Sequence, residues 1–128
     1  MTAAFSTMLR VELETDDTGD EGAGNWKLID PLVYHSDLLG GETITVPPGF
    51  VTDLASVPRW IGVYDFAGAR ADRAAVIHDY LIATRPDLNW KAKAGVFREA
   101  MLATGYREEV ADAFYAAVVA HGILSHKA

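Results

Sequence analysis

The hydrophobic pattern of the chain changes near residue 60, and this change constrains the fold more than any other feature. Before it, residues 9–14 alternate apolar and polar side chains with a period of two, as a strand with one buried face does. After it, the segments are rich in alanine and their apolar residues recur with the helical period of about 3.6. A strand-rich part followed by a helical part predicts an α+β fold, with a small antiparallel N-terminal sheet packed on a C-terminal three-helix bundle.

Further strands are predicted at residues 26–29, 32–34 and 42–46. Asp30 and Pro31 separate the segments 26–29 and 32–34. If the two segments form one strand, its internal proline restricts that strand to a sheet edge or a bulge. Residues 47–49, Pro-Pro-Gly, predict a tight turn that leads into Phe50. We interpret this half of the chain as an antiparallel meander.

Three helices are predicted in the second half. The first runs from about residue 70 or 72 to 83, and Pro86 ends it. The second begins at the N-cap Asn89 and ends near Gly105, and the third spans residues 107–121 with Gly122 as its C-terminal cap. The expected inward residues of these last two helices are Trp90, Ala94, Phe97, Met101, Val110, Phe114, Ala117, Val118 and His121.

Length, charge and composition indicate one domain and disfavour several classes of function. With 128 residues, we expect one domain that combines a β-rich half, residues 1–60, with a three-helix half, residues 70–124. The net charge of −7 repels phosphate backbones and disfavours nucleic acid as a partner. The chain has no cysteine and therefore no thiol nucleophile, and no apolar run approaches membrane-spanning length.

Two segments place polar residues in the most hydrophobic surroundings of the sequence. Residues 50–59 contain Asp53 and Ser56, and residues 74–81 contain His78 and Asp79. Buried polar groups need partners, so Asp53 and His78 are expected within the reach of a hydrogen bond or one bridging water. The four residues form either a structural polar cluster or a site.

As a catalytic site, His78 would be the general base, with Asp53 or Ser56 as its partner from the loop and Asp79 beside it. As a structural cluster, His78 would be a hydrogen-bonded spacer between helix and loop. Ser56 lacks the glycine-flanked elbow of serine hydrolases. In either case we expect Arg59 to pair with Asp79 or Asp53. A structural cluster should be sealed from solvent by Trp60, Phe66 and Tyr80, whereas a site must be reached.

No cofactor and no bound metal are predicted. The other histidines, His35, His121 and His126, lie far from His78 in the sequence, and the oxygen ligands near His78 are few.

The two segments resemble a family of uncharacterised domains of tailed bacteriophages and prophages. The resemblance rests on Phe-x-Thr-Asp-Leu-Ala-Ser-Val-Pro-Arg at residues 50–59, followed by His-Asp-Tyr-Leu at residues 78–81, and it extends over residues 44–122. It implies a phage origin but no particular activity. Our first hypothesis is a non-enzymatic bacteriophage protein, virion-associated (tail or capsid) or accessory, in which the polar cluster is structural. Its partners would be other phage structural proteins or its own copies, and it would lie in the host cytoplasm during assembly and then in the virion.

A second resemblance links His78 and Asp79 to the catalytic helices of secreted phospholipases A2. In those enzymes the histidine is the base for water, the adjacent aspartate holds calcium, and an aspartate on a second helix orients the histidine. Here Ala94 stands three residues before Phe97, where the orienting carboxylate would be. The alternative hypothesis is therefore a weak or metal-assisted hydrolase of cell-envelope material with His78 as general base, and solvent access to His78 distinguishes the two.

Overall fold

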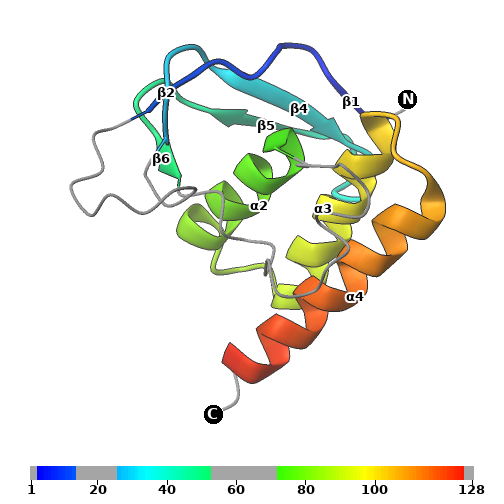
Figure 1. Cartoon of the computed structure of the whole chain (residues 1–128). Helices are drawn as coiled ribbons and strands as arrows, with labels where there is room; N and C mark the ends of the chain where they lie inside the picture. The colour runs from blue at the N-terminus through cyan, green and yellow to red at the C-terminus, as the bar shows by residue number, and fades with distance from the viewer. Residues whose placement is uncertain (1–2, 14–25, 53–71, 126–128) are drawn as a thin grey trace.

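The computed structural model describes residues 3–13, 26–52 and 72–125. In these residues short strands come first and helices follow (Figure 1). The strands are β1 (Ala4–Phe5), β2 (Val11–Leu13), β3 (Trp26–Leu28), β4 (Leu32–Ser36), β5 (Glu42–Val46) and β6 (Val51–Thr52). The helices are α2 (Asp72–Thr84), α3 (Trp90–Ala103) and α4 (Glu108–Ser125). Small antiparallel sheets followed by three packed helices confirm the predicted α+β class.

The strands form two sheets, so the prediction of one meander is wrong. Sheet A has the order β1-β4-β5 and sheet B the order β2-β3-β6, and all pairs are antiparallel. β3 and β4 follow each other in the chain but are the central strands of different sheets. Pro31 does not confine a strand to an edge, because it lies between β3 and β4, where no ladder hydrogen bond is needed from it.

The predicted turn at residues 47–49 is confirmed. Gly49 has φ of +90°, and the N–H of Phe50 donates to the carbonyl of Pro47 at 3.3 Å. Only glycine adopts this conformation readily at the third position of such a turn. The N–H of Gly49 also donates to the carbonyl of Leu28 at 2.8 Å, which fixes the turn on β3 and directs β6 toward the helices.

The helix ends follow the local sequence, with one correction. Asn89 caps α3 by accepting a hydrogen bond from the N–H of Ala92 at 2.8 Å, and Gly105, with φ of +98°, follows its end. α4 does not end at Gly122, as predicted, but continues to Ser125. A single glycine costs a helix interior only about 1 kcal/mol, and the apolar Ile123 and Leu124 follow it.

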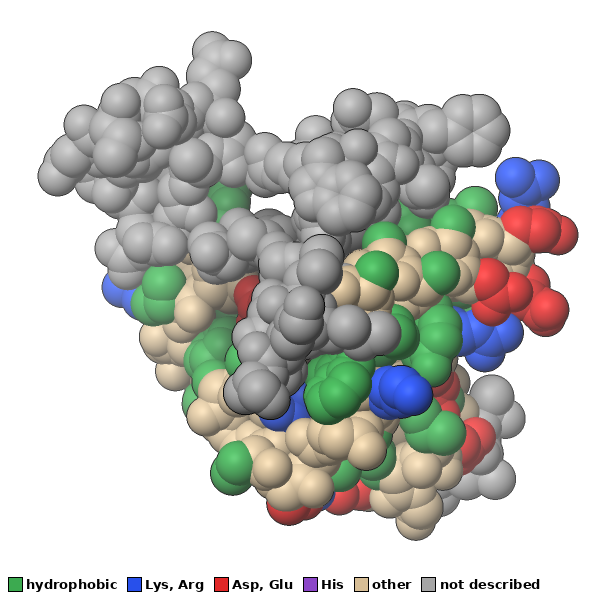
Figure 2. All heavy atoms as spheres, turned by 90° about the horizontal axis from the view of Figure 1, so that it is seen from below, with side chains coloured by type: hydrophobic (Ala, Val, Ile, Leu, Met, Phe, Trp, Pro, Cys, Tyr) green, Lys and Arg blue, Asp and Glu red, His purple; other side chains and the backbone are tan. Residues whose placement is uncertain are grey.

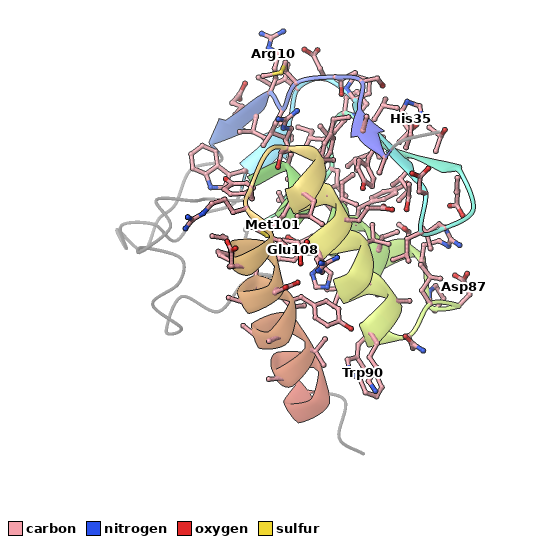
Figure 3. All side chains as sticks on the ribbon, turned by 90° about the vertical axis from the view of Figure 1, so that its right-hand side faces the viewer. Arg10, His35, Asp87, Trp90, Met101 and Glu108 are labelled. Atoms are coloured by element: carbon pink, nitrogen blue, oxygen red, sulfur yellow. The ribbon has the colours of Figure 1, made fainter. Side chains whose placement is uncertain are left out.

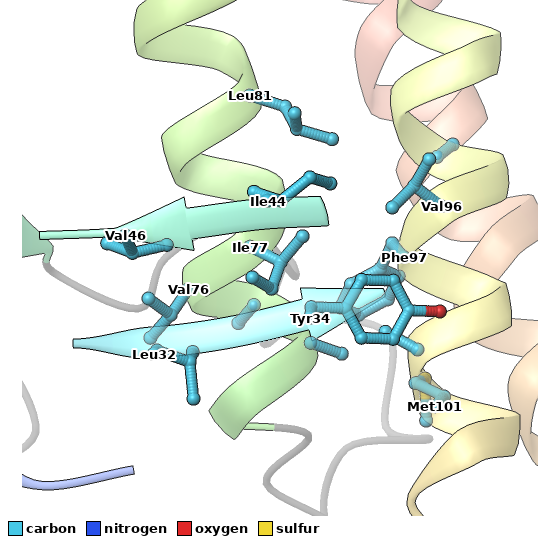
Figure 4. Packing of buried hydrophobic residues seen from close by; sticks show 14 of the residues in the cluster. Leu32, Tyr34, Ile44, Val46, Val76, Ile77, Leu81, Val96, Phe97 and Met101 are labelled. Atoms are coloured by element: carbon cyan, nitrogen blue, oxygen red, sulfur yellow. The ribbon is translucent and has the colours of Figure 1, made fainter. Parts of the chain in front are cut away.

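The core lies between sheet A and the helices. α2 packs against β5, α3 packs against β1, β4 and α2, and α4 packs on α3 (Figure 1). Along β4 and β5, every second side chain faces α2 and α3. These side chains pack against those of the two helices (Figure 4). The largest buried side chains of the described residues are Leu28, Leu32, Tyr34, Val46, Val76, Ile77, Leu81, Val96, Phe97, Met101 and Phe114.

Most of the expected inward residues are buried. Ala94, Phe97, Met101, Phe114 and Val118 belong to the core, whereas Trp90, Val110 and Ala117 are partly buried. The side chain of His121 lies outside the described residues. Ile82, one turn after His78 on α2, is 52% exposed, whereas Leu81 beside it is fully buried.

A carboxylate that the sequence did not single out joins α3 to sheet A. Glu99 Oε1 accepts hydrogen bonds from the hydroxyls of Tyr34 and Ser36, each at 2.7 Å, and Oε2 accepts from the N–H of Leu38 at 2.7 Å. Tyr34 and Ser36 are fully buried. Burial of the phenol and the adjacent Glu99 raise the pKa of Tyr34 well above its usual value.

None of the described helices is long and apolar enough to cross a membrane. On the face seen in Figure 2, hydrophobic side chains are spread among polar ones, and acidic and basic side chains lie next to each other at one edge.

We predict that Tyr34→Phe lowers the free energy of unfolding by about 1.5 to 3 kcal/mol at pH 7, because it removes a hydrogen bond to a charged group. The fold favours the neutral phenol. Its contribution is therefore complete below the unfolded pKa of about 10 and is lost as the pH rises above that value. Urea unfolding from pH 7 to 11 measures this: the difference between parent and Tyr34→Phe should shrink above pH 10.

Tyr115→Phe is the control for this prediction, since Tyr115 is only half-buried. An unchanged difference between parent and Tyr34→Phe across the whole pH range would contradict the role given to the phenol.

Candidate functional site

His78 lies inside the core, as its position in the helical pattern predicts. Its side chain is 6% exposed, and the centre of its ring lies 5.6 Å from the ring centre of Phe97 on α3. Ala74, Ala75 and Leu81 on the same face of α2 are also buried. The imidazole therefore occupies the apolar contact between α2 and α3.

Asp79 points in another direction, because consecutive helical residues are about 100° apart. It is half-buried, and its Oδ2 accepts a hydrogen bond from the hydroxyl of Thr52, the last residue of β6. Thr52 itself is 4% exposed. This contact joins the helical part of the chain to sheet B.

Tyr80 completes the contact between α2 and the turn before β6. Its ring is partly buried and meets the ring of Phe50 edge-on, with 5.3 Å between the ring centres and 82° between the planes. The structure thus brings residues 50–52 beside residues 78–80. These are the described parts of the two segments in which the sequence predicted a cluster.

Four of the predicted site residues, Asp53, Ser56, Arg59 and Trp60, lie outside the described residues. Their roles, and the predicted proximity of Asp53 to His78, stay predictions. Phe66 and His126 also lie outside them. His35 is on β4, where its ring nitrogens lie 3.0 Å from Thr43 Oγ1 and 3.3 Å from Ser6 Oγ.

The chemistry open to the described part of this site is limited by its surroundings. Ala94 of α3 is fully buried and supplies no carboxylate to orient an imidazole. Among the described residues, no group of three or more histidine, aspartate or glutamate side chains could hold a metal ion. The site offers a carboxylate engaged by a hydroxyl and an imidazole packed against an aromatic ring.

Sequence reasoning missed Thr52 as the partner of Asp79 and Glu99 as the partner of sheet A. Val51 is exposed and Thr52 is buried, the reverse of what the alternation of apolar and polar residues would predict for this pair. The strand period of two places Ser36 inward behind Leu32 and Tyr34, and a buried serine requires a partner. Neither pattern identifies the helix residue that supplies the carboxylate.

Comparison with known proteins places the chain in a family. No curated protein and no solved structure matches it. A family model described as a protein of unknown function matches residues 26–118, which is more than half of the chain and includes both segments of the candidate site. The chain therefore belongs to the family DUF1353.

Proposed function

We propose that the protein is a non-enzymatic, virion-associated or accessory component of a tailed bacteriophage or prophage, in which His78 and Asp79 act as a structural polar cluster with Asp53 and Ser56. The burial of His78 carries the proposal. A general base has to reach the proton that it removes, directly or through one water. At 6% exposure and against Phe97, the His78 ring is positioned to stabilise the helix contact.

The contact between Thr52 and Asp79 supports the structural role. A hydrogen bond to a charged group contributes about 1.5 to 3 kcal/mol, and loss of one partner leaves the other unsatisfied. Because the contact joins β6 to α2, the cluster would fix the relative position of the two parts of the chain. The resemblance of residues 50–59 and 78–81 to tailed-phage domains supports the phage assignment, and both segments lie within the family match.

The alternative is a weak or metal-assisted hydrolase of cell-envelope material with His78 as general base. One observation favours it: Asp79 contacts Thr52, which immediately precedes the segment that contains Asp53 and Ser56. The predicted base, carboxylates and serine therefore belong to segments that meet. This activity would require a route for water and substrate to the His78 ring.

On the proposed function, the protein lies in the host cytoplasm during assembly and then in the virion, and its partners are phage structural proteins or its own copies.

We predict that His78→Ala lowers the free energy of unfolding by about 1 to 3 kcal/mol, because the smaller side chain loses the packing against Phe97 and leaves a cavity between α2 and α3. Ile82→Ala is the matched control on the same helix, and its exposed side chain should leave stability within about 0.5 kcal/mol. Urea unfolding of the three proteins measures both effects. The parent protein should not hydrolyse phospholipid vesicles or purified peptidoglycan, whereas turnover that His78→Ala abolishes would favour the hydrolase.

A second prediction concerns the phage origin. In a strain that carries the gene, induction of the prophage should increase the amount of the chain, detected by quantitative mass spectrometry together with tail and capsid proteins. Purified particles then distinguish a virion component from an accessory protein. Constant synthesis that does not respond to induction would contradict the phage assignment.

A further inference from the structure

We propose that a groove between α3, α4 and the turn after β4 binds a small primary amine. The ammonium group of this ligand pairs with Glu99, and its apolar body lies on the apolar side chains of the groove. The inference goes beyond the proposed function, and it does not depend on the role of His78.

The groove has a volume of about 520 Å³ and is bordered by α3, α4 and the turn after β4. Figure 3 shows α3 with α4 on one side of it and the chain between β4 and β5 on the other. Pockets for small organic ligands usually have volumes of about 300 to 1,000 Å³, so a small ligand fits. The apolar lining comes from Leu38, Leu102 and Tyr115, and the charged lining from Arg98, Glu99 and Asp112.

The carboxylate of Glu99 is held in place but has not used all its acceptor positions. A carboxylate accepts about four hydrogen bonds, two at each oxygen. Oε1 of Glu99 accepts from the hydroxyls of Tyr34 and Ser36, whereas Oε2 accepts from the N–H of Leu38. One position at Oε2 therefore remains for a donor in the groove. Because three donors already fix the carboxylate, a ligand would not have to order it.

The charge of Glu99 has no ion-pair partner in the described part of the chain. Arg98, the next residue on α3, directs its Nε to Asp112 Oδ1 on α4 at 2.6 Å instead. The charges of Arg98 and Asp112 therefore cancel each other. Within the lining of the groove, the charge of Glu99 is the one that remains.

The charges next to the groove do not reverse this balance. Glu108 at the start of α4 and Asp37 in the turn after β4 are carboxylates, whereas Lys91 in the first turn of α3 is basic. Arg107 and Glu109 pair with each other at 3.8 Å. Carboxylates thus outnumber basic groups here, and the groove favours a cation.

Gly95 of α3 leaves room for the ligand. A Cβ at this position would lie 2.9 Å from Leu38 Cδ2, closer than carbon atoms pack. Alanine would therefore displace the end of the Leu38 side chain and narrow the groove. It would also favour the helix, because glycine is a weaker helix former than alanine.

These features select a primary ammonium group over other charged groups. Its N–H groups can donate to Glu99 Oε2, whereas a quaternary ammonium has no N–H to donate. An anion would meet the charge of Glu99 and would find Arg98 already neutralised by Asp112. The apolar body of the ligand would remove the surfaces of Leu38 and Tyr115 from water, and Leu38 is 55% exposed.

The test uses 2-phenylethylamine and the full-length protein labelled with ¹⁵N at pH 7, where an alkylamine is protonated. The amine should bind with a Kd of about 1 mM or tighter and shift the amide signals of Leu38, Gly95 and Glu99. 2-Phenylethanol keeps the ring but not the charge, and trimethyl(2-phenylethyl)ammonium keeps the charge but has no N–H. Each should bind about tenfold more weakly than the amine.

Variants separate the groove from the fold. Gly95→Ala should weaken binding of the amine about tenfold without lowering the urea concentration at the midpoint of unfolding. Glu99→Gln should remove the preference for the amine over the alcohol, and the same urea measurement shows whether this variant is folded. Ile82→Ala, with its exposed site on α2, should bind the amine as the parent does.

The proposal is overturned if the amine and the alcohol bind equally well, or if 10-fold more amine than the expected Kd, about 10 mM, shifts none of the three amide signals. It is also overturned if Gly95→Ala keeps the affinity of the parent. Tighter binding of Nα-acetyl-lysine methylamide than of 2-phenylethylamine would overturn it as well, because the groove would then accept a lysine side chain of another protein.

Discussion

The packing of α2 and α3 against the inner face of sheet A is the constraint on which the rest of the structure depends. It requires Ile44, Val46, Ile77 and Phe97 to meet in one core, and it carries His78 into that core with them. Once α2 has this orientation, Asp79 faces β6 and the end of the helix lies along β5. The geometry of the candidate site is thus a consequence of this helix placement.

Two carboxylates secure this packing at separate places. Asp79 holds the hydroxyl of Thr52, and Glu99 holds Tyr34, Ser36 and the backbone of Leu38. Each joins a helix to a strand, and each takes a buried hydroxyl that would otherwise need another partner. Hydrogen bonds weaken steeply away from their preferred distance and angle, so the carboxylates help to fix α2 on sheet B and α3 on sheet A.

The sequence predicted those features that local chemistry determines. β5 and the turn at Gly49 follow from alternation and glycine, and α3 follows from Asn89 and Gly105. Strand partners depend on contacts far apart in the chain, so the division into two sheets at Pro31 was not predicted. In the candidate site, the helical period placed His78 inward, but it could not choose Thr52 as the partner of Asp79.

The accessibility of the His78 ring tests the central claim most directly. Diethyl pyrocarbonate modifies accessible imidazole rings, and mass spectrometry measures the rate at each histidine. In the folded protein His78 should react much more slowly than His35, which is only partly buried on β4, and in urea the two rates should become equal. If His78 reacts as fast as His35 in the folded protein, its ring is open to solvent and the structural account is contradicted.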